Sequence, residues 1–167
     1  MPEEINPESG QAYYAGSVED VIRFCKALNI DSGRLAAVKP INVVGYMKTA
    51  EDIINGMLSE NYFVPVKPYN QVDVNGVPHL VFPGRIRYLA QQMTAGLLML
   101  TEFQHQEQNM NEAGAKMFEE AKKEVYQLTL WNNRIPGMQR RISRESHFMP
   151  VGVEPPHPLV DQIWSMN

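Results

Sequence analysis

The stretch from residue 83 to residue 103, PGRIRYLAQQMTAGLLMLTEF, constrains the fold more than any other part of this sequence. Its first residue, Pro83, suits the start of a helix, because the amide hydrogen that proline lacks has no helical partner there. The middle of the stretch is apolar almost all round, and a helix of that kind is usually enclosed by other helices. A chain of 167 residues can supply such neighbours within one domain. We therefore expect a helical bundle with this segment near its centre.

Three further segments show the apolar period of a helix, with apolar residues recurring every three or four positions. They are residues 17–29, 41–60 and 115–131. The first begins with Ser17 and Asp20, which can form a capping box, because each side chain can accept a hydrogen bond from the backbone amide of the other residue. The sequence therefore predicts an all-α fold built as a four-helix bundle.

The segments between these helices are expected to be connectors. DSGRLAAVKP (31–40) ends in a proline that can sit in the first turn of the next helix, and NMNEAG (109–114) is expected to end the helix before it. Cys25 lies on the apolar stripe of its helix, which predicts a buried, inert thiol. The residues expected in the core of the bundle are Ile54, Met57, Leu97, Leu98, Leu100 and Val125.

Residues 62–82 interrupt the helical pattern with an extended excursion. Asn75-Gly76, placed between alternating residues, is a signal for a β-hairpin within this excursion. A hairpin of this size is too short and too exposed to stabilise itself. We therefore expect it to contact a neighbouring subunit or another component of an assembly. The residues expected at that interface are Tyr62, Phe63, Val64, Val72, Val74, Asn75 and Gly76.

The two ends of the chain differ in composition from the helical domain, which we place at residues 13–131. Residues 1–12 are polar with proline and glycine, and they are expected to form a flexible arm. Residues 132–167 hold five prolines after residue 135 and no helical period, so they are expected to form a long extended C-terminal arm.

This arm carries an apolar hook only a few residues from its end, and a solvated tail has no physical reason to contain a tryptophan there. We expect the arm to dock on a partner protein, because an aromatic anchor in a pocket is a common source of affinity. The alternative is that the arm folds back on its own bundle. The expected docking residues are Arg140, Arg141 and Arg144, facing acidic groups, and Phe148, Leu159, Ile163 and Trp164, in apolar pockets.

The sequence offers no constellation of catalytic residues, so neither an enzyme nor a cofactor is expected. The single cysteine excludes an internal disulfide and any multi-cysteine zinc site. Glu102 and His105 have the spacing of half a di-iron carboxylate site, but a whole site needs a second such pair and two further glutamates. The chain lacks a secretion-signal pattern and an apolar run of about 18 residues. A soluble, cytoplasmic product is therefore expected.

The basic segment QRRISR (139–144) leaves a second function open. Arg140, Arg141 and Arg144 could bind the phosphates of a nucleic acid, which would suit a small helical DNA-binding or packaging-associated protein. The net charge of −4 and the lack of an accompanying aromatic platform favour a protein-docking strip instead.

Four motifs follow one another in a distinctive order: YYAGSVEDVIRF, AEDIINGMLSENYFVPV, FPGRIRYLAQQMTAGLLML and MFEEAKKEVYQLT. This order resembles the head–tail connector (adaptor) family of tailed bacteriophages and prophages, over roughly residues 13–131. Phe118 stands where the family commonly has tyrosine, and the 67–79 excursion is longer than the usual link. The motif positions are occupied by Tyr13 or Tyr14, Glu19, Asp20, Ala50, Ile54, Asn55, Leu58, Tyr62, Pro65, Phe118, Ala121 and Val125.

The resemblance implies an all-α bundle that assembles as a ring, typically twelve-fold, beneath the portal protein. Such a ring keeps a channel open for DNA without sequence-specific binding, and it offers a platform for the next neck or tail component. The resemblance also implies that the C-terminal segment docks against the portal and that the protein has no enzymatic activity. The expected location is the neck of the virion, and the host cytoplasm during assembly.

Overall fold

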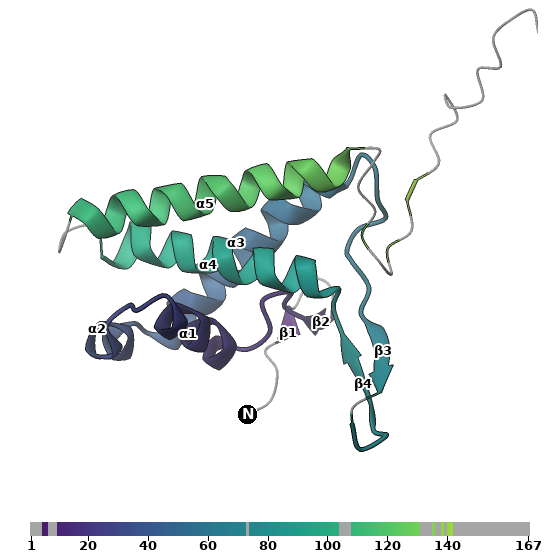
Figure 1. The fold of residues 1–167 in the computed structure, drawn as a ribbon, viewed down its shortest axis with the longest axis horizontal. Helices are drawn as coiled ribbons and strands as arrows, with labels where there is room; N and C mark the ends of the chain where they lie inside the picture. The colour runs from purple at the N-terminus through teal and green to yellow at the C-terminus, as the bar shows by residue number, and fades with distance from the viewer. Residues whose placement is uncertain are drawn as a thin grey trace, which may run out of the picture.

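In the computed structural model, helices make up most of the chain and two short antiparallel hairpins accompany them (Figure 1). The structure describes residues 5–6, 10–72, 74–103, 108–130, 135, 138, 140 and 141. The helices are α1 (Val18–Ala27), α2 (Ser32–Ala37), α3 (Pro40–Leu58), α4 (Gly84–Glu102) and α5 (Gln108–Thr129). The strands are β1 (Ile5–Asn6), β2 (Gln11–Ala12), β3 (Tyr69–Val72) and β4 (Pro78–Val81); β1 pairs with β2, and β3 with β4. The fold is therefore mainly α-helical.

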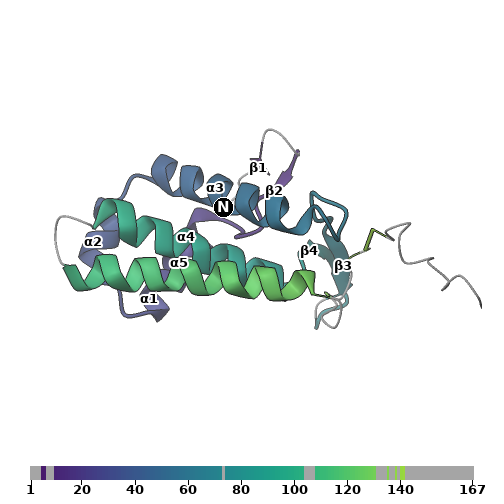
Figure 2. The same cartoon turned by 90° about the horizontal axis from the view of Figure 1, so that it is seen from above.

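Helix α4 lies among the other long helices. It packs along α5 and also contacts α3 and α1, and two perpendicular views show α4 and α5 side by side, running in opposite directions (Figures 1 and 2). Ile86, Leu89, Met93 and Leu98 are fully buried on it, which confirms the predicted central helix. Among the described residues, no helix combines the length and apolar character needed to cross a bilayer.

The start of α1 follows its sequence signals. The Asp20 amide donates to Ser17 Oγ at 3.2 Å, and the Ser17 amide donates to Asp20 Oδ2 at 3.0 Å, so the predicted capping box is confirmed. Arg87 of α4 lies 3.1 Å from Asp20 Oδ2 and joins the two helices. Burial acts to raise the pKa of Asp20, but the hydrogen bonds from Ser17 and the charges of Arg87 and Arg23 outweigh it, and the pKa is lowered. Pro40 begins α3 as expected.

Two segments that were predicted to lack regular structure contain it. Residues 31–40 hold α2, whose Leu35 is buried. The described part of residues 1–12 forms the β1–β2 hairpin, so the prediction of a flexible arm is wrong there. Asn6 of β1 is buried and donates to Glu51 Oε1 of α3 at 2.8 Å. Leu35 and Val38 anchor residues 31–40 in the core, and Asn6 anchors the first hairpin.

The stretch 109–114 lies inside α5, so the predicted break before this helix is wrong. Gly114 lies where α5 approaches α4 closely: a β-carbon added at Gly114 would lie 2.7 Å from Met99 Cβ and 3.0 Å from the carbonyl oxygen of Gly96. A β-carbon added at Gly96 would in turn lie 3.0 Å from the Gly114 carbonyl oxygen. Glycine is needed here for contact between two backbones and not for a turn.

The predicted core is confirmed in part. Ile54, Leu98 and Val125 are fully buried. Met57, Leu97 and Leu100 are only half-buried, because the apolar surface of each helix is wider than the stripe that its neighbours cover.

Cys25 lies on the buried face of α1, as predicted. Burial raises the pKa of its thiol to about 11. The thiolate is the reactive form of cysteine, so little of it is present near neutral pH.

Replacing Gly114 by alanine is expected to lower the free energy of unfolding by about 1–3 kcal/mol, the usual cost of overpacking. Gly56 of α3 is the matched control, because nothing lies within 4 Å of a β-carbon added there. Gly56→Ala is expected to raise the free energy of unfolding by about 0.5–1 kcal/mol, since alanine favours the helix. Urea denaturation measures both variants. Equal changes in the two variants would contradict a tight α4–α5 contact.

Candidate docking surface

The β3–β4 hairpin stands at one end of the helical body, away from α2 (Figures 1 and 2). Its register pairs Tyr69 with Val81 and Val72 with Pro78. Gly76 has a φ of +81°, a conformation that glycine adopts without strain. The hairpin predicted from Asn75-Gly76 is therefore confirmed.

The hairpin exposes large apolar side chains. Val74 at its tip is fully exposed, while Val72 and Leu80 are each 62% exposed. Residues 70 and 80 are paired, as are 72 and 78, so Val72, Pro78 and Leu80 lie on one face of the ribbon. Val77 adds a further half-exposed side chain beside the tip. We call Val72, Val74, Val77 and Leu80 the hairpin patch.

Residues 62–64, which precede the hairpin, lie partly in the core and partly at the surface. Tyr62 was expected at an interface but is only 1% exposed, and its hydroxyl donates to the carbonyl oxygen of Leu128 in α5 at 3.0 Å. Tyr62 therefore belongs to the core of its own chain, because the turn after α3 directs it against the end of α5. Phe63 remains exposed, and Val64 is half-buried against the core.

Arg140 and Arg141 lie against the helical body. Arg140 Nη2 donates to the carbonyl oxygen of Leu130 at 2.7 Å, and its guanidinium lies 5.2 Å from the centre of the Tyr62 ring. Arg140 thus places a cation near the carboxyl end of α5, where the helix dipole favours it. The Arg141 amide donates to the carbonyl oxygen of Asn61 at 2.9 Å, and its exposed side chain lies 5.6 Å from the Phe63 ring centre.

The other predicted arm residues lie outside the described residues: Arg144, Phe148, Leu159, Ile163 and Trp164. Docking of the arm through them remains a prediction, and so does the alternative of fold-back. Of the predicted arm, the described residues 140 and 141 contact one place on the helical body. That place lies beside Asn61 and Tyr62.

Tyr14 fixes the base of the hairpin. Its hydroxyl donates to Asn55 Oδ1 of α3 at 2.7 Å and accepts the Val66 amide at 2.5 Å. Its ring meets Phe82, the residue after β4, edge to face with 5.0 Å between ring centres. Burial raises the pKa of Tyr14 far above its ordinary value, so the hydroxyl keeps its proton. One side chain thus holds both ends of the excursion that carries β3 and β4.

A buried carboxylate holds Tyr14 in place. Glu51 of α3 is 2% exposed, and its Oε2 accepts the backbone amide of Tyr14 at 3.0 Å while Oε1 accepts Asn6. Glu51 was not among the residues predicted to be buried. The available signal was its position, four residues after Met47 and three before Ile54, which are both core positions.

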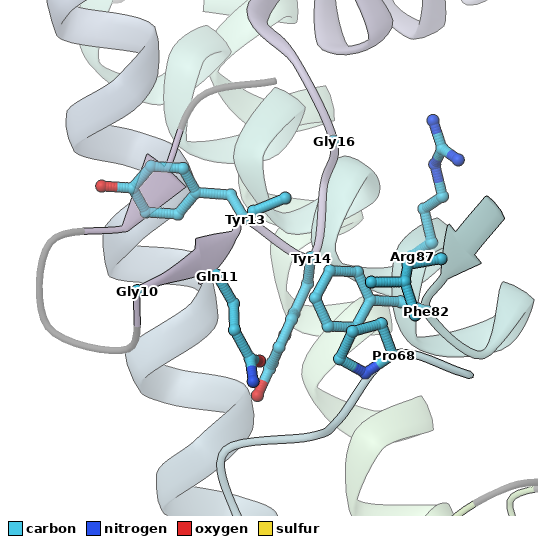
Figure 3. A pocket seen from close by; sticks show the side chains of 10 residues that line it. Gly10, Gln11, Tyr13, Tyr14, Gly16, Pro68, Phe82 and Arg87 are labelled. Carbon is cyan, nitrogen blue, oxygen red and sulfur yellow. The ribbon is translucent and has the colours of Figure 1, made fainter. Parts of the chain in front are cut away.

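A pocket of about 210 Å³ opens beside this cluster (Figure 3). Tyr14 and Phe82 lie side by side in its wall with Pro68 next to them, and the guanidinium of Arg87 points away from these rings (Figure 3). Leu80 of the hairpin patch also lines it. The lining is mainly aromatic and aliphatic, so the pocket can receive a small apolar group at the base of the hairpin.

Replacing Tyr14 by phenylalanine keeps the contact with Phe82 but leaves the buried Val66 amide and Asn55 without the hydroxyl. We expect the free energy of unfolding to fall by about 1–3 kcal/mol, and the Val66 amide to exchange hydrogen faster. Tyr126→Phe is the control, because Tyr126 is an exposed tyrosine of α5. Chemical denaturation and amide exchange measure the two effects. Unchanged exchange at Val66 would show that Tyr14 does not hold the excursion.

Groups of three or more His, Cys, Asp or Glu side chains able to hold a metal ion are absent from the described part of the chain. No family model, curated protein or solved structure matches this chain.

Proposed function

We propose that this protein is a structural head–tail connector of a tailed bacteriophage. In this proposal α1, α3, α4 and α5 form the four-helix bundle of each subunit. The subunits assemble as a ring, of about twelve copies, beneath the portal protein. The ring extends the channel through which DNA passes and carries the next neck or tail component. The protein acts in the virion neck and has no enzymatic role.

The way the motif positions meet in space supports the proposal. Tyr14 and Asn55 belong to two different motifs, and their side chains share a hydrogen bond of 2.7 Å. Several other motif positions are buried together in one core: Ala50, Ile54, Leu58, Tyr62, Ala121 and Val125. The ordered pattern thus corresponds to one connected framework, as expected if it describes the body of a fold and not chance matches to common residues.

The hairpin patch is the observation that carries an assembly role. A two-stranded hairpin is marginally stable in water, and this one keeps four large aliphatic side chains at least half exposed. Fully burying such a side chain contributes roughly 1.5–3 kcal/mol, so the patch represents a large gain that its own chain does not use. Part of that gain would be offset by the entropy lost on association. A neighbouring subunit or the next neck component would bury the hairpin patch.

The contacts of Arg140 and Arg141, which belong to the predicted C-terminal arm, support a second contact in the same region. The described residues 140 and 141 contact Tyr62 and Asn61, in the segment that leads from α3 to the hairpin. In the proposal the arm, residues 132–167, continues from there along the portal protein. A proline-rich arm loses less conformational entropy on docking than a flexible one. The hairpin end of the subunit is then its assembly end.

The contacts of Arg140 disfavour the alternative of a DNA-binding protein. That alternative needs Arg140, Arg141 and Arg144 directed at phosphates. Arg140 is instead engaged with the end of α5 and with Tyr62. A titration with DNA over a range of salt concentrations separates the two functions, because phosphate binding weakens steeply as salt increases. Strong, salt-dependent binding by a monomer would overturn the connector proposal.

Deleting residues 70–78 is expected to leave the helical body folded and to impair assembly. The strands β3 and β4 pack mainly on each other, so the free energy of unfolding should change by less than about 1 kcal/mol. Circular dichroism during denaturation measures folding, and native mass spectrometry, with and without the portal protein of the same phage, measures assembly.

Two results would contradict this assignment. Unfolding of the isolated deletion variant would place the hairpin in the core of its own chain. Assembly of the variant to the same mass as the wild-type protein would show that the hairpin is not an interface.

A further inference from the structure

The β3–β4 hairpin has two open edges. Its sheet contains only these two strands, the strands pack mainly on each other, and the hairpin projects beyond the end of the helical body (Figure 1). In the described part of the chain, no strand therefore lies beside the outer edge of β3 or of β4. An open edge presents backbone groups that can pair with a strand of another chain.

Pro78 shows which backbone groups point to these edges. In an antiparallel pair of strands, hydrogen-bonded residue pairs alternate with pairs that are not hydrogen-bonded. Pro78 has no amide hydrogen, so its pair with Val72 is of the second kind. The pair of Asn70 and Leu80, two residues further along each strand, is then of the second kind as well. The backbone N–H and C=O groups of such residues point away from the partner strand, toward the outer edges of the hairpin.

The two edges are complementary. The β3 edge presents the N–H and C=O groups of Asn70 and Val72, and the β4 edge presents both groups of Leu80 and the carbonyl of Pro78. When the β4 edge of one hairpin lies antiparallel to the β3 edge of another, Leu80 and Asn70 can exchange two hydrogen bonds. The Val72 amide can then donate a third hydrogen bond to the Pro78 carbonyl oxygen. A shift of this register by two residues would leave one outward residue of each strand without a partner in the other strand.

Pairing of these two edges suits a ring. The contact joins different edges of identical chains, so it is heterologous, and repeating it generates a ring when the rotation closes. The strands around that ring are alternately β3 and β4, and neighbouring strands are antiparallel throughout. Closure leaves no strand edge exposed. The alternative is that β3 pairs with β3 of a second copy, which would close at two chains.

We propose that the outer edge of β4 in one subunit pairs with the outer edge of β3 in the next, so that the hairpins form one closed antiparallel sheet. The inference rests on the proposed ring assembly and names the contact that joins its subunits. Val72, Pro78 and Leu80 share one face of each hairpin, and residues paired between subunits also share a face. The apolar side chains of neighbouring hairpins therefore form one continuous band. A sheet of many strands with an apolar face is stable where a single hairpin is only marginally so.

Disulfide formation between two single-cysteine variants tests this contact. The proposed register places Gln71 of one subunit opposite His79 of the next, in a pair without hydrogen bonds, whose residues lie close enough for a disulfide. A chain with only Gln71→Cys or only His79→Cys cannot form this disulfide within itself, because its remaining cysteine, Cys25, is buried. The two variants are mixed, assembled with the portal protein of the same phage, oxidised mildly and separated without reducing agent. We expect covalent dimers in the mixture and their loss on reduction.

Two controls define this result. Each variant assembled alone should give no covalent dimer. A mixture of Gln71→Cys with Thr49→Cys should give none either, because Thr49 is exposed on α3, outside the hairpin.

A matched pair of variants at Asn70 tests the backbone hydrogen bonds themselves. Asn70→Pro removes the outward amide hydrogen that the proposed contact uses, and it removes none that holds the hairpin together. Asn70→Ala keeps this amide and removes only the side chain. We expect Asn70→Pro to raise the protein concentration at which half of the chains are assembled by about tenfold, the effect of one lost hydrogen bond. Asn70→Ala should leave that concentration nearly unchanged.

The outcomes separate this inference from the proposed function. An assembly of the correct mass without covalent dimers in the mixture, or equal assembly of Asn70→Pro and Asn70→Ala, would overturn the edge-to-edge contact and leave the connector proposal standing. Covalent dimers from Gln71→Cys alone would indicate that β3 pairs with β3 of a second copy, and they would overturn the inference. A wild-type protein that stays monomeric with and without the portal protein would overturn both proposals.

Discussion

The hydrogen bond between the Val66 amide and the Tyr14 hydroxyl is the interaction on which the placement of the hairpin depends. Val66 begins the link to β3, and Tyr14 is held in turn by Asn55 and by the buried carboxylate of Glu51. A buried polar group that loses its partner costs the full desolvation penalty. The network therefore acts as a unit, because the loss of one of its hydrogen bonds would leave a buried polar group without its partner.

This network gives the hairpin a defined direction although few of its own side chains are buried. Phe82 closes the excursion against the Tyr14 ring, so the chain leaves the body and returns to it at one fixed point. A docking element that is already ordered loses less entropy on binding than a loop that must be organised. The close contact between Gly96 and Gly114 has a similar role for the body, because it sets how near α5 lies to α4.

Much of the fold could be predicted because it depends on local patterns. The apolar stretch after Pro83 predicted the central helix, the pair of Ser17 and Asp20 predicted a helix start, and Asn75-Gly76 predicted the hairpin. The errors arose where a distant partner decides the structure. Gly114 looked like a helix break because its role is contact with Gly96, which lies 18 positions earlier in the chain.

The docking surface was predictable to a smaller extent for the same reason. The exposure of Val72 and Val74 follows from their place in a short hairpin. Tyr62 lies in the same predicted excursion but is buried, and its hydroxyl donates to the carbonyl oxygen of Leu128 in a distant helix. The basic segment 139–144 could indicate an interface, but the sequence alone could not show that Arg140 contacts the end of α5.

Hydrogen exchange at residues 69–81, compared between the free and the assembled protein, tests whether the hairpin is an assembly surface. We expect these amides to exchange quickly in the free protein, because the two strands have solvent on both faces. We expect strong protection in the assembly, with no change at fully buried positions of α4 such as Met93. Equal exchange at residues 69–81 in the free and the assembled protein would contradict it.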